Sequence, residues 1–332
     1  MSDISKDIYV YIEQRDCQIE KGSIELIGEA KKLAKELDYK VVGVIIGNGV
    51  SKVANEVIEY GADEVIVIDA PVFENYTTEP YTKAMVYVIN ERHPDIILVS
   101  ASSLGRDLAP RISARVHTGL TADCTQLEID PEKKILLMTR PAFGGNIMAT
   151  IICENNRPQI ATVRGGVMQA LDKDPARTGV ITNMDTGVTE ADLNVEVLEV
   201  IKSVRDKVDI SAAEIIVSGG RGVGSTEGFK LLEDVANILG GVVAGSRGAV
   251  DEGWVSKPQQ VGQTGTTVRP KLYIACGISG AIQHIAGMEG SEYIIAINKD
   301  PGAEIFKYAN VGIVGDVKKV LPLLAKELEA CK

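Results

Sequence analysis

Short apolar runs alternate with amphipathic stretches along both halves of this chain, and that alternation limits the folds open to it. In the first half, four such runs each precede a stretch with the apolar spacing of a helix: 8–12, 40–46, 64–68 and 96–99. The alternation returns later, with apolar runs at 214–218, 242–244, 271–277, 293–298 and 313–315. Strands that alternate with helices form parallel sheets through right-handed crossovers. The sequence therefore predicts an α/β fold with two doubly wound, Rossmann-like parallel sheets.

The first alternation stops after Thr118. Residues 122–164 instead carry three extended segments separated by Pro and Gly: 135–139, 147–153 and 159–163. Short apolar segments between turn residues are typical of hairpins. We therefore expect extra antiparallel strands at the edge of the first sheet.

The polar, irregular stretch 170–210 marks a boundary between two domains. Domain boundaries fall in polar linkers that few contacts cross. We place the boundary near 195–210, which gives an N-terminal α/β domain over 1–200 and a C-terminal α/β domain over 201–332.

Composition excludes several classes of function. The net charge is −11 and no Lys- or Arg-rich run is present, so a nucleic-acid partner is not expected. No apolar stretch approaches the roughly 20 residues that cross a bilayer, so we expect no membrane insertion. Residues 1–7 include acidic groups and no apolar segment, which favours a cytoplasmic location.

Cysteine and histidine usage gives no support for a metal site. The five cysteines are scattered and form no CxxC pair, which argues against an iron–sulfur cluster and a disulfide framework. The three histidines are far apart in sequence: His93, His117 and His284. If the protein carries electrons, an organic cofactor must hold them.

A glycine-rich segment, 218–225, follows one predicted strand and opens a helix. Glycines let backbone amides approach an anion, and a helix N-terminus favours negative charge. However, the GxGxxG spacing is absent, and Ser225 stands where a P-loop would carry Lys. The segment fits a phosphate site or a simple tight turn.

Other predicted strands end in polar residues at the same sheet edge. Ser279 opens a predicted helix over 281–288 that carries His284, and Asn298 and Asp316 follow the next two strands. Doubly wound folds bind ligands at the carboxyl ends of their strands, and Asn and Asp suit ribose hydroxyls or an adenine edge. A lone histidine can equally be a packing residue.

Two arginines are predicted at this edge, Arg221 in the glycine-rich segment and Arg247 after the strand 242–244. Little carboxylate opposes them in the local sequence. Their placement favours an anionic or electron-rich ligand, although both could be ordinary surface residues.

Together these segments resemble the alpha subunit of electron transfer flavoprotein. The matching motifs are Arg221, SRGAVD at 246–251, VGQTG at 261–265, SGAIQH at 279–284, AINKDP at 296–301 and GRDLAPR at 105–111. The pair SGAIQH and AINKDP is highly specific to that family. The resemblance extends over essentially the whole chain and is strongest from 214 to 325.

The resemblance implies FAD in the second domain, covered by the C-terminal part of a beta subunit. It assigns these cofactor-binding residues: Arg221, Ser246, Arg247, Val261, Gly262, Gln263, Thr264, Ser279, Gly280, Ala281, Ile282, Gln283, His284, Asn298 and Asp316.

Their roles follow from the same resemblance. The two arginines would lie by the isoalloxazine, with Gln263 and Thr264 at its edge and His284 by N1 and C2. The pyrophosphate, ribose and adenine would be held by Ser246, Ser279, Gln283, Asn298 and Asp316. One-electron reduction puts negative charge near N1, which Arg247 and a protonated or donating His284 would stabilise as an anionic semiquinone.

The resemblance implies an electron carrier rather than an enzyme acting alone. It would pass single electrons from an NADH- or acyl-CoA-linked flavoenzyme to a quinone-, ferredoxin- or enoyl-CoA-linked acceptor. The first domain would dock the beta subunit, and the FAD domain would swing about linkers near 195–210.

Three readings of the function stay open. Residues 118–125 and 140–149 look like those of anaerobic bacterial members, which favours an NADH-dependent, potentially bifurcating acyl-CoA reductase system. The first alternative is a plain carrier that accepts electrons from acyl-CoA dehydrogenases. The second is an NAD-dependent dehydrogenase, disfavoured by the missing GxGxxG and the lack of an evident acid–base pair.

Overall fold

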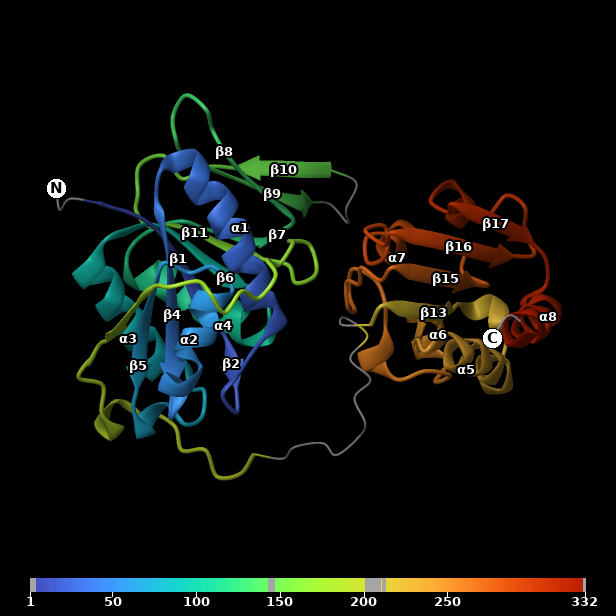
Figure 1. Cartoon of the computed structure of the whole chain (residues 1–332), viewed down its shortest axis with the longest axis horizontal. Helices are drawn as coiled ribbons and strands as arrows, with labels where there is room; N and C mark the ends of the chain where they lie inside the picture. Colours follow the sequence, from blue (N-terminus) through green and yellow to red (C-terminus); the bar gives the residue numbers. More distant parts are fainter. Residues whose placement is uncertain (1–3, 143–146, 201–209, 211–212, 331–332) are drawn as a thin grey trace. The chain divides into compact units, whose positions relative to one another are not determined.

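The computed structural model describes residues 4–142, 147–200, 210 and 213–330, and the chain divides into two compact units (Figure 1). Unit 1 spans Met1–Ile201 and unit 2 spans Lys202–Lys332. Much of the predicted boundary segment, 201–209, lies outside the described residues. Each unit is an α/β structure with its own buried core, as the sequence predicts.

Unit 1 consists of strands and helices in the order β1 (Ser5–Ile12), β2 (Gln14–Arg15), β3 (Gln18–Ile19), α1 (Lys21–Leu37), β4 (Lys40–Gly47), α2 (Ala54–Glu59), β5 (Glu64–Asp69), α3 (Thr78–Arg92), β6 (Pro94–Ser100), α4 (Ser103–Arg115), β7 (Leu120–Cys124), β8 (Gln126–Ile129), β9 (Leu136–Ala142), β10 (Ile147–Ile151), β11 (Gln159–Val163) and β12 (Val180–Asn183).

The large sheet of unit 1 is parallel, with strand order β12-β5-β4-β1-β6-β11-β7. One core lies between this sheet and α1 and α2, and it includes Leu26 and Val57. A second core lies on the opposite face against α3 and α4, and it includes Met85 and Leu108. Helices on both faces make the unit doubly wound. The strands are therefore buried on both sides and carry the β-branched runs that mark them in the sequence.

The expected antiparallel strands are present, but one of the three predicted segments belongs elsewhere. β8, β9 and β10 form a separate antiparallel sheet. Residues 159–163, predicted as a hairpin-like addition, are instead β11, a fully buried parallel strand between β6 and β7. A short apolar run has the same appearance in a hairpin and in a buried parallel strand, so the prediction for this segment is wrong.

Unit 2 consists of strands and helices in the order β13 (Ile215–Gly219), η5 (Arg221–Val223), α5 (Thr226–Leu239), β14 (Val242–Gly245), α6 (Arg247–Asp251), η6 (Lys257–Gln259), β15 (Leu272–Cys276), α7 (Ile282–Ile285), β16 (Tyr293–Asn298), η7 (Glu304–Lys307), β17 (Val311–Val314) and α8 (Val317–Ala330), where η marks a 3₁₀ turn.

The sheet of unit 2 is also parallel, with strand order β14-β13-β15-β16-β17. α5 and α8 pack on one face through Phe229, Leu232 and Leu321. The opposite face packs against α7 and η7, with Tyr273 and Ile285 in its core. The chain leaves β13 for β14 on one side and returns to β15 on the other. Order 2-1-3-4-5 thus places a switch point between β13 and β15, where doubly wound folds bind ligands.

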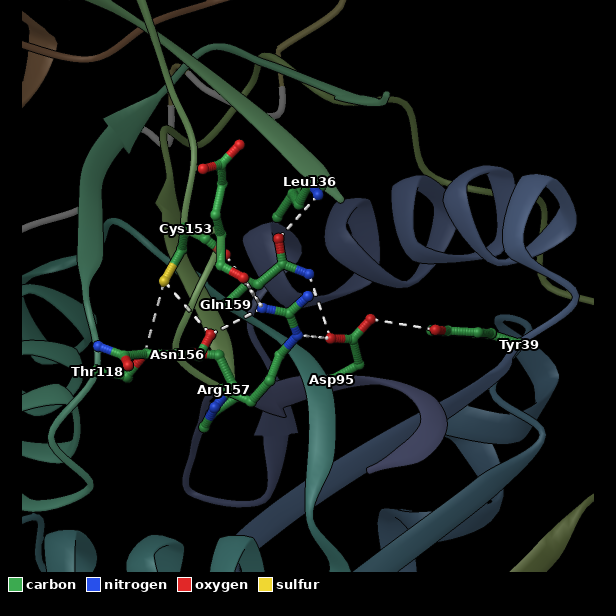
Figure 2. A network of polar contacts seen from close by, with 10 residues as sticks. Tyr39, Asp95, Thr118, Leu136, Cys153, Asn156, Arg157 and Gln159 are labelled. Carbon is green, nitrogen blue, oxygen red and sulfur yellow. Dashed lines mark hydrogen bonds and ion pairs between the residues drawn. The ribbon is translucent and has the colours of Figure 1, made fainter. Parts of the chain in front are cut away.

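A buried polar network joins the start of β6 to Tyr39, Arg157 and Gln159, which come from other parts of unit 1, as Figure 2 shows. Asp95, at the start of β6, forms an ion pair with Arg157 and accepts hydrogen bonds from Tyr39 Oη (3.2 Å) and Gln159 Nε2 (3.3 Å). Gln159 Oε1 in turn accepts from the Leu136 amide at 2.9 Å. Burial and the Asp95 carboxylate raise the pKa of Tyr39 to about 12, so the phenol remains a donor.

Replacing Asp95 with Ala would remove the carboxylate that pairs with Arg157 and accepts from Gln159. We expect the change to lower the free energy of unfolding by about 3 kcal/mol, because breaking a buried pair leaves an uncompensated charge. Urea unfolding followed by far-UV circular dichroism measures this. The matched control is Glu154→Ala, which removes the exposed Lys133–Glu154 pair and should leave the urea midpoint close to that of the wild type. Equal midpoints for the two variants would contradict the role of Asp95.

Candidate cofactor-binding site

A cavity of about 630 Å³ lies at the switch point of unit 2, lined by the segments that follow β13, β14, β15 and β16. Its volume is within the roughly 300–1,000 Å³ usual for small-molecule and cofactor sites. It brings together most of the residues predicted from the sequence: Arg221, Ser246, Arg247, Val261, Gly262, Thr264, Ser279, Ala281, Gln283, His284 and Asn298.

Four predicted residues do not line the cavity: Gln263, Gly280, Ile282 and Asp316. Gln263 and Gly280 are neighbours of lining residues. Asp316 lies at the start of α8, where its Oδ1 accepts from the Lys318 amide at 2.9 Å. Contact between FAD and any residue of the predicted set remains a prediction.

The sequence reading missed other lining residues: Gly220, Gly222, Gly248, Asp251, Gln260, Gly277, Ile278, Asp300 and Ala303. Gly220 and Gly222 belong to the glycine-rich segment, and Asp251 ends the SRGAVD motif. Their presence beside predicted residues was a usable signal. Ala303 has no such signal in the sequence, because only the course of the chain after β16 brings it to the cavity.

The floor of the cavity is bare backbone. The Gly222 amide donates to Gly277 O at 3.0 Å, and the Gly220 amide donates to Cys276 O at 2.9 Å. A Cβ on Gly222 would lie 2.7 Å from Gly277 Cα, and Gly277 itself has φ +62°. Two loops therefore touch without side chains between them. Without side chains there, the flat or anionic part of a cofactor can approach the backbone closely, which is the fit that a dinucleotide requires.

Only the first part of the segment 218–225 takes part in this floor. Gly220, Arg221 and Gly222 line the cavity. Ser225 caps α5 instead, since its Oγ accepts from the Gly228 amide at 3.2 Å. The segment is thus cavity floor at one end and an ordinary helix start at the other.

The two arginines reach the cavity from neighbouring loops. Arg221 follows β13 and Arg247 follows β14. The Arg221 stem crosses the start of α6, where a Cβ on Gly248 would come within 3.0 Å of Arg221 Cγ. Arg247 forms a long ion pair with Asp251, Nε to Oδ2 3.6 Å, and its side chain is 72% exposed. This flank of the cavity therefore carries two guanidinium groups near solvent.

The opposite flank is built on β16. Asn298 Nδ2 donates to Ile278 O at 2.9 Å, and Asn298 Oδ1 accepts from the Asp300 amide at 3.0 Å. The first bond holds the loop after β15 against the end of β16, and the second fixes the turn that follows β16. Asp300 adds a carboxylate here, whereas the flank at β13 and β14 carries two arginines against the single carboxylate of Asp251 and is cationic on balance.

His284 lies between the floor and the core. Nδ1 is 3.1 Å from Val261 O and Nε2 is 3.0 Å from Tyr273 Oη. Burial lowers the pKa of His284 to about 4, so the ring is neutral at pH 7. The N–H of this neutral ring donates to Val261 O, and a role of His284 toward FAD stays a prediction.

A doubly wound sheet with a bare backbone floor and cationic flank at its switch point defines a nucleotide- or flavin-binding domain. Comparison with known proteins makes the class specific. Residues 8–187 match the family described as Electron transfer flavoprotein domain, and residues 209–289 match the Electron transfer flavoprotein FAD-binding domain.

Relatives match over nearly the whole chain. The electron transfer flavoprotein subunit alpha of Thermoanaerobacterium thermosaccharolyticum is 51% identical over 98% of this chain and 99% of its own length. Protein FixB of Clostridium saccharobutylicum is 53% identical over 97% of each chain. The acryloyl-CoA reductase electron transfer subunit beta of Anaerotignum propionicum is 44% identical over 98% of this chain and 96% of its own length.

The chain belongs to the electron transfer flavoprotein alpha-subunit family, and its C-terminal unit is an FAD-binding domain. Among the residues that the structure describes, no helix is long and apolar enough to cross a membrane. The same residues contain no cluster of His, Cys, Asp or Glu arranged to hold a metal ion.

Proposed function

We propose that this chain relays single electrons through FAD held in the cavity of unit 2, as part of a cytoplasmic complex with a beta subunit. The observation that supports this most is the cationic flank, where Arg221 and Arg247 meet a backbone floor at the switch point. FAD supplies the redox chemistry, since it accepts electrons one at a time.

The chain's own residues would set how readily FAD takes the first electron. The Arg247 guanidinium is charged at any physiological pH and stabilises negative charge on the ring. His284 contributes only as a neutral dipole, because its burial disfavours a second proton. Of the two residues expected to stabilise the reduced flavin, Arg247 thus carries the charge.

The electron donor is proposed to be NADH through the beta subunit, and the acceptor an acyl-CoA reductase. One relative's name, the Anaerotignum propionicum acryloyl-CoA reductase electron transfer subunit beta, supports an acyl-CoA-linked partner. Two relatives come from anaerobic clostridia, in line with the likeness at 118–125 and 140–149. A plain carrier that serves acyl-CoA dehydrogenases is the competing function.

Unit 1 is proposed to dock the beta subunit, with the FAD unit moving about the segment near 195–210. In support, β10 exposes Ile147, Met148 and Ile151 on the outer strand of the antiparallel sheet, each at least 40% accessible. Apolar side chains grouped on one exposed strand suit a protein partner.

Co-expression with the beta subunit followed by anaerobic NADH titration tests this function. We expect two FAD per heterodimer and bleaching of the flavin absorbance by NADH. One FAD that NADH does not reduce would support the plain carrier instead. A purified complex that lacks flavin and binds NAD tightly would contradict both and favour a dehydrogenase.

Replacing Arg247 with Gln should lower the potential of the first electron by on the order of 50 mV, since one charge-assisted contact of about 1 kcal/mol corresponds to roughly that shift for a one-electron couple. Anaerobic spectroelectrochemistry measures it. The matched control is Lys230→Gln, which removes the same charge from α5, outside the cavity lining. Equal potentials in the two variants would remove Arg247 from this role.

A further inference from the structure

Tyr273 is a buried residue beside the cavity that the proposed function does not use. It lies in the middle of β15, fully buried, on the face of the sheet that packs against α7. It does not line the cavity. A phenol hydroxyl removed from water needs a hydrogen-bond partner, because leaving it unpaired is costly. Its Oη is 3.0 Å from Nε2 of His284.

The hydrogen-bond partners fix the protonation of the His284 ring. A carbonyl oxygen can only accept, so Nδ1, 3.1 Å from Val261 O, must carry the hydrogen. In the neutral ring Nε2 then has a lone pair, and Tyr273 Oη must be the donor. Burial raises the pKa of Tyr273, which keeps its hydroxyl protonated. The two hydrogen bonds therefore share one direction: Tyr273 donates to His284, and His284 donates to Val261 O. We call this pair of bonds the relay.

This relay ends on the loop that forms one wall of the cavity. Gln260, Val261, Gly262 and Thr264 line the cavity, and the Gln263 amide donates to Gln283 O at 2.7 Å. The loop and the turn that follows α7 meet closely, because a Cβ on Gly287 would lie 2.4 Å from Gly262 Cα. His284 Nδ1 and Gln283 O thus hold the same loop at two adjacent points.

We infer that Tyr273 is a positioning residue of the cofactor site. By donating to Nε2, Tyr273 holds the His284 ring in the Nδ1–H form. The ring then donates to the Val261 carbonyl and so stabilises the position of the loop 260–266, which forms one wall of the cavity. The part of this inference that concerns FAD rests on the proposed function, and the part that concerns the His284 ring does not. Tyr273 touches neither the cavity nor, by this account, the cofactor.

The test compares Tyr273→Phe with Tyr293→Phe in the heterodimer with the beta subunit. Tyr293 lies on the neighbouring strand β16 with its side chain 44% exposed, so the same atom is removed without touching the relay. The first readout is the ¹⁵N spectrum of histidine side chains after selective labelling, with the His284 signals assigned by their loss in His284→Gln.

In the wild-type protein at pH 7, we expect one protonated His284 nitrogen and one unprotonated nitrogen with the shift of a hydrogen-bonded lone pair. Tyr273→Phe should move the second signal toward that of a free lone pair, and Tyr293→Phe should leave it unmoved. A wild-type ring protonated at Nε2, or a Tyr273→Phe spectrum identical to wild type, would overturn the inference. The wild-type spectrum decides even if the variant folds poorly.

The second readout is the rate at which FAD leaves the heterodimer, followed by the rise of free-flavin fluorescence. We expect about fivefold faster release in Tyr273→Phe, the effect of one lost hydrogen bond, and no change in Tyr293→Phe. Equal release rates would overturn the positioning role. If neither the wild-type heterodimer nor its variants bind FAD, the proposed function fails, while the ¹⁵N spectrum still shows whether Tyr273 donates to His284.

Discussion

The contact between the loops that follow β13 and β15 is the constraint on which unit 2 depends. Gly220 and Gly222 lie directly against Cys276 and Gly277, with backbone hydrogen bonds of 2.9 and 3.0 Å between them. No side chain fits there, so the sheet ends in a floor of peptide groups. Three features surround this floor: the cationic flank, the Asn298 side chain bonded to Ile278 O, and the loop 260–266 that His284 contacts. The chain runs from β13 to β14 on one side and returns to β15 on the other. The floor therefore lies at the switch point of the sheet, where doubly wound folds bind ligands.

The two flanks of the site serve different needs. Arg221 and Arg247 are held by short elements near solvent, where their charge can act on a ligand and is partly screened by water. The side facing the core contains neutral donors and acceptors, His284 and Tyr273, that are buried and satisfied. The charged groups thus lie at the rim of the cavity, and the groups that fix the shape of its wall lie toward the core.

Both parallel sheets could be predicted from the sequence because β-branched runs are local signals, and most lining residues could be predicted because their motifs resemble those of the electron transfer flavoprotein family. What failed was non-local. β11 has the appearance of a hairpin strand until its neighbours β6 and β7 are known. α7 is only Ile282–Ile285, shorter than the predicted 281–288, because the chain turns after Ala286 to bring Gly287 against Gly262. Tyr273 gave no signal at all, since a buried tyrosine in a strand is ordinary until its partner is seen.

Hydrogen exchange of the heterodimer with and without FAD tests the central claim most directly, that the floor and wall of this cavity hold the cofactor. We predict slower exchange in the FAD-loaded protein at 220–223, 260–266 and 277–281, the segments that carry the cavity residues. Loops of unit 1 such as 47–51 should exchange at the same rate in both states. Unchanged exchange in all three cavity segments, or protection confined to unit 1, would contradict the account.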